Sequence, residues 1–84
     1  MRYRVVIPKK VQKKLDTIDG VYRDRIVAAL AGLQENPYRG TKLYGKRGEE
    51  WSCSVWPSRI VYRIEHEKVV ILIIKKGHRP DVSQ

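Results

Sequence analysis

The 84-residue sequence has one cysteine, no phenylalanine and half as many acidic as basic residues. Cys53 has no second cysteine to pair with, which excludes an internal disulfide and fits a reducing, cytoplasmic compartment. The opening segment MRYRVVIPKK contains no apolar stretch typical of a secretory signal. The longest apolar run, Val69 to Ile74, is far shorter than the roughly 20 residues that span a membrane. We therefore expect a cytoplasmic protein with no membrane role.

Metal-binding and catalytic motifs with a distinctive spacing are also missing. The two histidines and the single cysteine are scattered along the chain, unlike a set of metal ligands. Cys53 has no base beside it and is interpreted as a small buried strand residue. The acidic pairs Glu49–Glu50 and Glu65/Glu67 lie near expected turns, as solvated surface groups do. We expect neither a metal ion nor a small-molecule cofactor.

Positive charge is what the sequence has in excess. Its 18 lysines and arginines outnumber 9 acidic residues and produce a net charge of +9. Such an excess favours a polyanionic partner, either a nucleic acid, an acidic protein or an anionic membrane surface. Charge says little about the fold, for which the periodicity of apolar residues is the better guide.

The length predicts one domain, residues 1–84. Apolar residues alternate over residues 3–7, as in a half-buried strand. They recur every three or four positions over residues 9–18 and 20–36, which predicts two amphipathic helices. Pro37 ends the second helix because proline disfavours helical geometry in the residue before it.

The second half of the sequence predicts a loop and three strands. Residues 37–50 contain glycines and basic residues without a clear period, so we expect a loop there. Strands are expected at residues 51–56, 59–65 and 68–75, with turns between them. The strand at 68–75 is apolar on both faces, which is typical of a central strand covered on both sides.

These elements predict an α+β fold, in which a twisted antiparallel four-stranded sheet carries two N-terminal helices on one face. The face without helices, hollowed by sheet twist, is the expected place for a functional site. If Ile60, Tyr62 and Ile64 face the helices, Arg59 and Arg63 point to the opposite face.

Basic residues of three separate segments can meet on that face. They are Lys46 and Arg47 in the loop, Arg59 and Arg63 on a strand, and Lys75, Lys76, His78 and Arg79 near the end. Arginine grips phosphate with two donors, whereas histidine carries protons near neutral pH. Trp51 and Trp56 can stack on bases only if they are exposed. The residues alone leave two alternatives open: a groove that binds nucleic acid, and one that also cleaves RNA without a metal.

The sequence resembles the RelE/ParE toxin superfamily over essentially its whole length. The resemblance rests on RIVYRI at residues 59–64, the apolar strand 69–74 and GHRPDV at residues 77–82. The first half agrees more loosely, through Pro8 and the helix that ends before Pro37. The resemblance implies a toxin of a type II toxin–antitoxin system with the fold described above. RelE-like members cleave mRNA in the ribosomal A site and ParE-like members poison DNA gyrase; the Gly-His-Arg ending favours the RelE-like branch.

The resemblance also implies roles for single residues. Arg59 matches the strand arginine that contacts the scissile phosphate, and Arg79 matches the arginine that stabilises the transition state. Two strand lysines of the best-known RelE are replaced here by Ser52 and Ser54, and its C-terminal tyrosine by Ser83. These departures remove the general base of the family.

We expect His78 to transfer protons in its place. The alternatives for this role are Lys46, Lys75 and Lys76. The other basic residues of the set are expected to bind RNA.

The partners implied are a RelB-like antitoxin, mRNA and the ribosomal A site. Such antitoxins wrap the toxin with a segment that orders on binding. Two other interpretations stay open, a ParE-like gyrase poison and a toxin-fold binding protein with weak or no nuclease activity.

Overall fold

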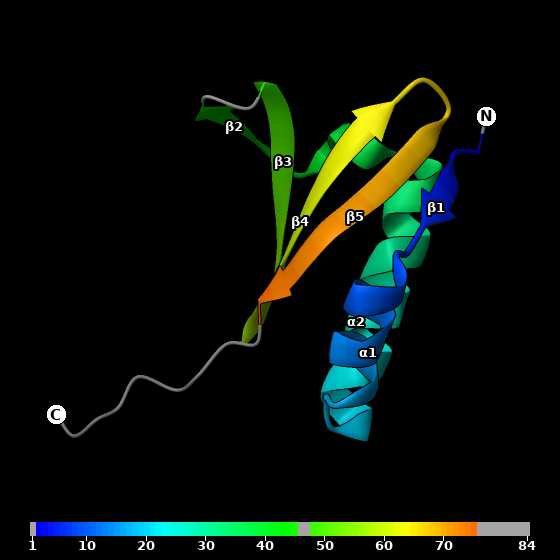
Figure 1. Ribbon diagram of the computed structural model, residues 1–84, viewed down its shortest axis with the longest axis vertical. Helices are drawn as coiled ribbons and strands as arrows, with labels where there is room; N and C mark the ends of the chain where they lie inside the picture. Colours follow the sequence, from blue (N-terminus) through cyan, green and yellow to red (C-terminus); the bar gives the residue numbers. More distant parts are fainter. Residues whose placement is uncertain (1, 46–47, 76–84) are drawn as a thin grey trace, which may run out of the picture.

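The structure, a computed structural model, describes residues 2–45 and 48–75 (Figure 1). The elements in chain order are β1 (Arg4–Val6), α1 (Lys9–Asp16), α2 (Gly20–Glu35), the 3-10 turn η1 (Pro37–Arg39), β2 (Thr41–Gly45), β3 (Gly48–Val55), β4 (Ser58–Glu65) and β5 (Lys68–Lys75). The α+β class and the two helices are confirmed. In the described part of the chain, neither helix has the length and apolar character needed to cross a membrane.

The sheet has five strands in the order β1-β5-β4-β3-β2. The prediction of a four-stranded, fully antiparallel sheet is therefore wrong in two respects. Residues 41–45, expected in a loop, form β2 and pair antiparallel with β3 from Thr41↔Ser52 to Gly45↔Gly48. The strand β1 pairs with β5 in parallel. A parallel pair needs a long crossover connection, and in this chain the two helices and three strands between β1 and β5 provide it.

The two helices follow the predicted apolar spacing. Val11 and Leu15 are the buried residues of α1, which ends at Thr17, whose hydroxyl donates to the carbonyl of Lys14 at 2.7 Å. The helix α2 buries three apolar residues and ends at Asn36, directly before Pro37. The Asn36 side chain then accepts a hydrogen bond from the backbone N–H of Tyr38, 3.2 Å away, and starts η1.

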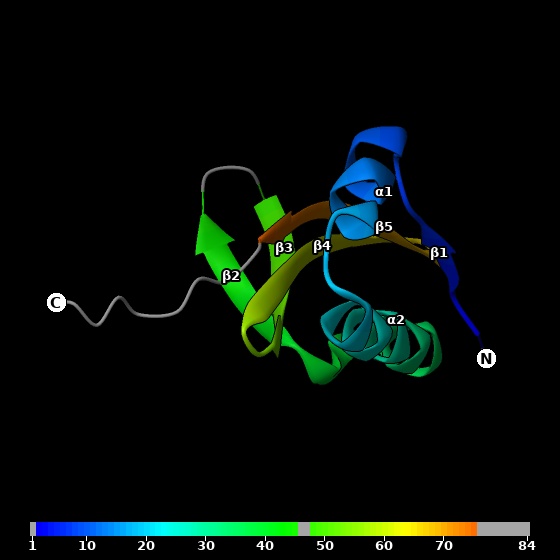
Figure 2. The same ribbon diagram turned by 90° about the horizontal axis from the view of Figure 1, so that it is seen from below.

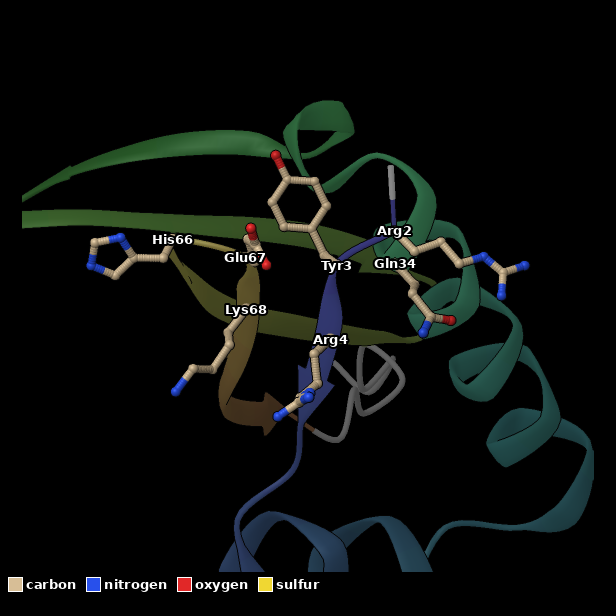
Figure 3. Close-up of a pocket in the computed structure, with 7 residues that line it drawn as sticks. All are labelled: Arg2, Tyr3, Arg4, Gln34, His66, Glu67 and Lys68. Carbon is tan, nitrogen blue, oxygen red and sulfur yellow. The ribbon is translucent and has the colours of Figure 1, made fainter.

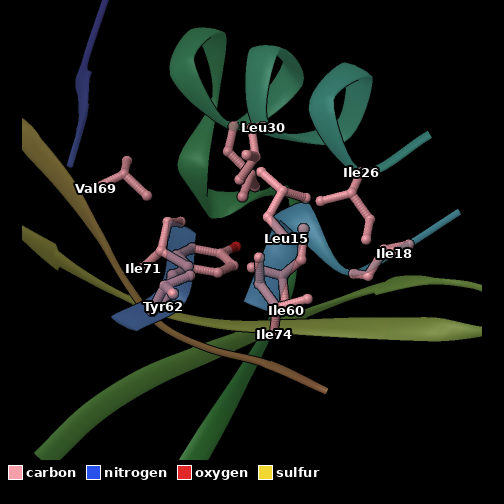
Figure 4. Packing of buried hydrophobic residues seen from close by; sticks show 11 residues of the cluster. Leu15, Ile18, Ile26, Leu30, Ile60, Tyr62, Val69, Ile71 and Ile74 are labelled. Atoms are coloured by element: carbon pink, nitrogen blue, oxygen red, sulfur yellow. The ribbon is translucent and has the colours of Figure 1, made fainter. Parts of the chain in front are cut away.

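The hydrophobic core lies between the helices and one face of the sheet. Figure 4 shows side chains of both helices meeting those of β4 and β5 in one cluster. Ile60 and Tyr62 are fully buried in this cluster, and Ile64 packs against it. The condition under which Arg59 and Arg63 point to the opposite face, that these three residues face the helices, is therefore met. Their alternation places Arg59, Val61 and Arg63 on the opposite face.

A bulge changes the apolar pattern of β5. Its pairing with β4 jumps from Ile73 to Ile71, so that Leu72 faces no residue of the β4 ladder. The extra residue lets Ile71 and Ile74 both point to the core, although they are three positions apart. Ile73 stays 47% exposed on the other side. The strand lies inside the sheet, between β1 and β4, but the central strand is β4, and the expectation that both faces of β5 are covered is wrong.

The helices cover only part of the sheet's width. Figures 1 and 2 show the helix pair beside β1, β5 and β4, whereas β2 extends past it. Three residues of β3, Trp51, Cys53 and Val55, still pack against the core. Figure 1 also shows that the end of β5 lies next to the turn between β3 and β4. We call the side of the sheet opposite the helices the open face.

Candidate nucleic-acid interface

A row of three polar residues crosses the open face near the turn between β3 and β4. Ser54 lies opposite Arg59, and Arg59 lies opposite Lys75, so neighbouring side chains stand about 5 Å apart at Cβ. We call these three residues the basic end. Arg59 and Lys75 are both exposed, and among the described residues no carboxylate lies within ion-pair distance of either.

Two cations directly opposite each other on a sheet repel, which costs about 0.2–1 kcal/mol. Such an arrangement does not help the fold, but it concentrates positive charge where an anion can bind. The basic end is therefore the best candidate for a phosphate-binding site in the described chain.

Arg63 lies on the same face but in a different electrostatic environment. Its guanidinium is 3.8 Å from the carboxylate of Glu50 and 3.5 Å from that of Glu65. The two carboxylates more than balance its charge. A phosphate at Arg63 would have to displace them, so its predicted role in RNA binding has less support than that of Arg59.

A hollow of about 420 Å³ adjoins the basic end. It is lined by Arg39, Gly40, Thr41, Leu43, Ser52, Cys53, Ser54 and Arg59. The hydroxyl groups of Thr41, Ser52 and Ser54 can donate hydrogen bonds to an anion, but they carry no charge. The lining of the hollow includes the predicted Arg59 and a second arginine, Arg39, that the sequence did not mark.

Arg39 is positioned by its packing on α2. Its guanidinium lies against Gly32, where the Cβ atom of any other residue would collide with it. In the sequence, Arg39 stands in a segment without a clear period, so nothing marked it as a site residue. The signal that could have found it is its place just before Gly40, in a tight turn between two regular elements.

Cys53 lines the same hollow but is a poor nucleophile. Partial burial raises the pKa of its thiol, and the nearby Arg39 guanidinium opposes this shift without cancelling it. The thiol therefore stays protonated near neutral pH, and the thiolate is the reactive form. The sequence predicts a small buried strand residue; Cys53 lies on β3 and packs against the core, but it is only half-buried.

Tyr62 fixes the segment that contributes Arg39. Its hydroxyl donates a 2.7 Å hydrogen bond to the carbonyl of Pro37 in η1. Gly40 leaves the necessary space, because a Cβ atom there would collide with the Tyr62 hydroxyl and the Ser52 carbonyl oxygen. Burial raises the pKa of Tyr62 to about 12, so its phenol remains a donor at any physiological pH.

The two tryptophans differ in exposure. Trp51 is partly buried and makes an edge-to-face contact with Tyr38, with ring centroids 5.4 Å apart. Trp56 stands in the two-residue turn between β3 and β4 and is 68% exposed. Stacking on a base requires an exposed indole ring, and of the two tryptophans only Trp56 has one.

A second hollow, of about 520 Å³, lies where β1, the end of α2 and the turn between β4 and β5 meet (Figure 3). Its lining comprises Arg2, Tyr3, Arg4, Gln34, His66, Glu67 and Lys68. Figure 3 shows Arg2, Arg4 and His66 pointing in different directions instead of toward one point. Arg2 also pairs with Glu35 at 3.3 Å. This hollow therefore lacks the convergence expected of a catalytic site.

Five residues of the predicted site lie outside the described residues. They are Lys46, Arg47, Lys76, His78 and Arg79. Their assigned roles remain predictions. The described chain ends at Lys75, directly opposite Arg59. Within residues 2–45 and 48–75, no cluster of three His, Cys, Asp or Glu residues could hold a metal ion.

Comparison with known proteins identifies one family. The family described as the ParE toxin of type II toxin-antitoxin system, parDE, matches residues 5–81. No curated protein sequence matches the chain.

Solved structures of RelE toxins share the fold. The archaeal RelE–RelB complex from Pyrococcus horikoshii OT3 matches with a TM-score of 0.81 and 25% identity, over 95% of this chain and 100% of that one. The RelBE2 complex of Mycobacterium tuberculosis matches with a TM-score of 0.81 and 24% identity, over 93% and 95% of the two chains. The isolated E. coli RelE toxin matches with a TM-score of 0.80 and 20% identity, over 96% and 90%.

Proposed function

Because the chain belongs to the RelE/ParE toxin family of type II toxin–antitoxin systems, we propose that it is a RelE-like endoribonuclease that cleaves mRNA in the ribosomal A site. The observation that supports this most is the basic end, where the exposed Arg59 faces Lys75 and no described carboxylate neutralises either. A phosphate group can bind there without displacing a carboxylate of the described residues.

The proposed chemistry needs no metal. The 2′-hydroxyl loses a proton and attacks the adjacent phosphorus, the bond from phosphorus to the 5′-oxygen breaks, and the leaving oxygen gains a proton. Arg59 binds the scissile phosphate with two donors, and Arg79 stabilises the charge that grows in the transition state. His78 is proposed to move the protons, since arginine keeps its own at all relevant pH values.

The serines of the hollow fit only part of this scheme. Ser52 and Ser54 can donate hydrogen bonds to phosphate oxygens but cannot act as bases near neutral pH. We therefore assign proton transfer to His78, near the end of the chain. This segment follows Lys75, the residue that pairs with Arg59.

The proposed partner is a RelB-like antitoxin. Two of the structures compared above are toxin–antitoxin complexes, which supports a partner of this kind. An antitoxin segment with acidic residues would neutralise the basic end and block access of RNA to Arg59. The protein is proposed to act in the cytoplasm, where ribosomes translate mRNA.

The test is to induce the protein in cells and map mRNA 5′ ends, with and without translation. We expect cuts inside codons of translated messages. Arg79→Ala should reduce cutting most and Arg59→Ala next, each by about 10²–10³-fold, since each removes a transition-state contact. Arg4→Ala removes an exposed arginine of β1 and should change little. Growth arrest with intact mRNA, or full cutting by the Arg59/Arg79 double variant, would contradict the proposal.

A gyrase poison is the second candidate, because the description of the family that matches residues 5–81 names the ParE toxin. This function predicts trapped cleaved DNA and induction of the DNA-damage response, with mRNA left intact. In a third outcome, the protein shows neither activity but still binds RNA or an antitoxin. The chain would then be a binding protein, in which Ser52 and Ser54 stand in place of catalytic groups.

A further inference from the structure

Trp56 has the highest exposed fraction, 68%, of the large hydrophobic residues in the described chain. It stands in the turn that Val55 and Ser58 close by pairing across β3 and β4. The next pair of this ladder is Ser54 and Arg59. An exposed indole thus lies at the tip of the hairpin formed by β3 and β4. Arg59 is the cation of the open face that lies nearest to this tip along β4.

Among the described residues, the charge around this tip has one sign. No acidic residue occurs from residue 51 to residue 64. The nearest carboxylates of the open face, Glu50 and Glu65, lie farther along β3 and β4 and pair with Arg63. Lys75 adds a second cation opposite Arg59. The tip therefore combines an exposed aromatic ring with cations that no described carboxylate neutralises.

We propose that Trp56 is a stacking platform for an unpaired base of the RNA strand whose phosphate Arg59 binds. The inference rests on the proposed function and specifies how the site holds its substrate. Every base has a π face, so an indole can stack on any of them, while neighbouring cations hold the backbone. The other tryptophan does not serve this purpose, because Trp51 is partly buried against Tyr38.

The first experiment measures binding of the purified full chain to a fluorescein-labelled decamer of single-stranded 2′-O-methyl RNA, which lacks the attacking hydroxyl. Trp56→Leu keeps an apolar side chain without a π face and should weaken binding about tenfold or more. Trp56→Tyr should restore most of the affinity. The salt dependence should not change in either variant, because no charge is removed.

Tryptophan fluorescence provides a second measurement on the same complex. RNA should quench the emission of the Trp51→Phe variant, in which Trp56 is the remaining tryptophan. The matched control, Trp56→Phe, retains Trp51 and should show little quenching. Strong quenching in the control and none in the Trp51→Phe variant would overturn the inference.

A cellular measurement separates this inference from the proposed function. If the wild-type protein cuts mRNA and Trp56→Leu cuts equally well with the same base preference, the stacking role is wrong and the nuclease function stands. If the wild-type protein leaves mRNA intact, the proposed function itself fails. If Trp56→Leu weakens antitoxin binding and leaves RNA binding and cutting unchanged, Trp56 is a protein contact and the inference is overturned.

Discussion

The hydroxyl group of Tyr62 connects two parts of the molecule that are 25 residues apart in the sequence. Its ring is fully buried on β4, while its oxygen donates to the carbonyl of Pro37 in η1. This bond helps to hold the segment before β2 against the sheet, and that segment contributes Arg39 to the lining of the hollow. The position of Arg39 thus depends on Tyr62, a residue buried in the core.

We predict that Tyr62→Phe lowers the free energy of unfolding at pH 7 by about 1–3 kcal/mol, because the buried Pro37 carbonyl loses its donor. The raised pKa of Tyr62, about 12 against an ordinary 10.0, favours the neutral phenol in the folded state. This stabilisation is complete below pH 10 and is lost as the pH rises from about 10 to about 12.

Urea unfolding of both proteins at pH 7 and at increasing pH above 10 checks this prediction. The difference between the wild type and Tyr62→Phe should shrink as the pH passes 10. Tyr22→Phe, a change at a partly exposed tyrosine, is the control and should show neither effect. A Tyr62→Phe difference that is constant up to pH 11 would contradict the assignment.

At the scale of elements, the attachment of β2 was the feature that sequence patterns did not predict. Residues 41–45 alternate only weakly, and the segment before them contains Pro37 and Gly40, which are typical of a loop. The strand forms because residues 41–45 pair antiparallel with β3, beginning at Thr41↔Ser52, and so add an edge strand to the sheet. Gly40 allows this approach, since it is the point where the chain passes Tyr62 and Ser52.

We predict that Gly40→Ala destabilises the protein by about 1–3 kcal/mol, because the added methyl group overlaps the Tyr62 hydroxyl and the Ser52 carbonyl. Gly20→Ala is the matched control. Nothing lies within 4 Å of its added Cβ atom, and alanine reduces the entropy of the unfolded chain. Gly20→Ala should therefore be neutral or stabilise by up to about 1 kcal/mol. Thermal unfolding measures both variants, and equal effects would refute the packing argument.

At the scale of the whole molecule, the chain carries a net charge of +9, and the cations of the open face differ in how far carboxylates neutralise them. Arg59 and Lys75 at the basic end lack carboxylate partners among the described residues, whereas Arg63 is paired with Glu50 and Glu65. The same residue type on one strand thus stands in two different electrostatic environments. One arginine is available to a phosphate, and the other is part of an internal charge network.

This distribution predicts different salt dependences of RNA binding. Arg59→Ala should lower the slope of log K against log salt by about 0.7, the amount expected for one phosphate contact on a single strand. Arg63→Gln should leave the slope nearly unchanged. Fluorescence anisotropy between about 50 and 200 mM salt measures both. A slope that falls equally in the two variants would place Arg63 in the interface after all.

The sequence by itself determined the α+β class, both helices and the three strands of the second half. In each of these elements, the spacing of apolar residues can be recognised within the segment itself. The side on which these residues lie is the side that the fold buries. It also pointed to Arg59, because a clear alternation with Ile60 and Tyr62 decides which way that side chain faces.

Tertiary structure alone decided the rest. The strand β2, the parallel pairing of β1 and the bulge in β5 arise from partners distant in the sequence. The same holds for the packing of Arg39 over Gly32, the pairing of Arg63 with two carboxylates, and the different exposure of Trp51 and Trp56. Local periodicity carries no information about which neighbour a side chain meets across the sheet, and that neighbour decides whether its charge or ring remains available to a ligand.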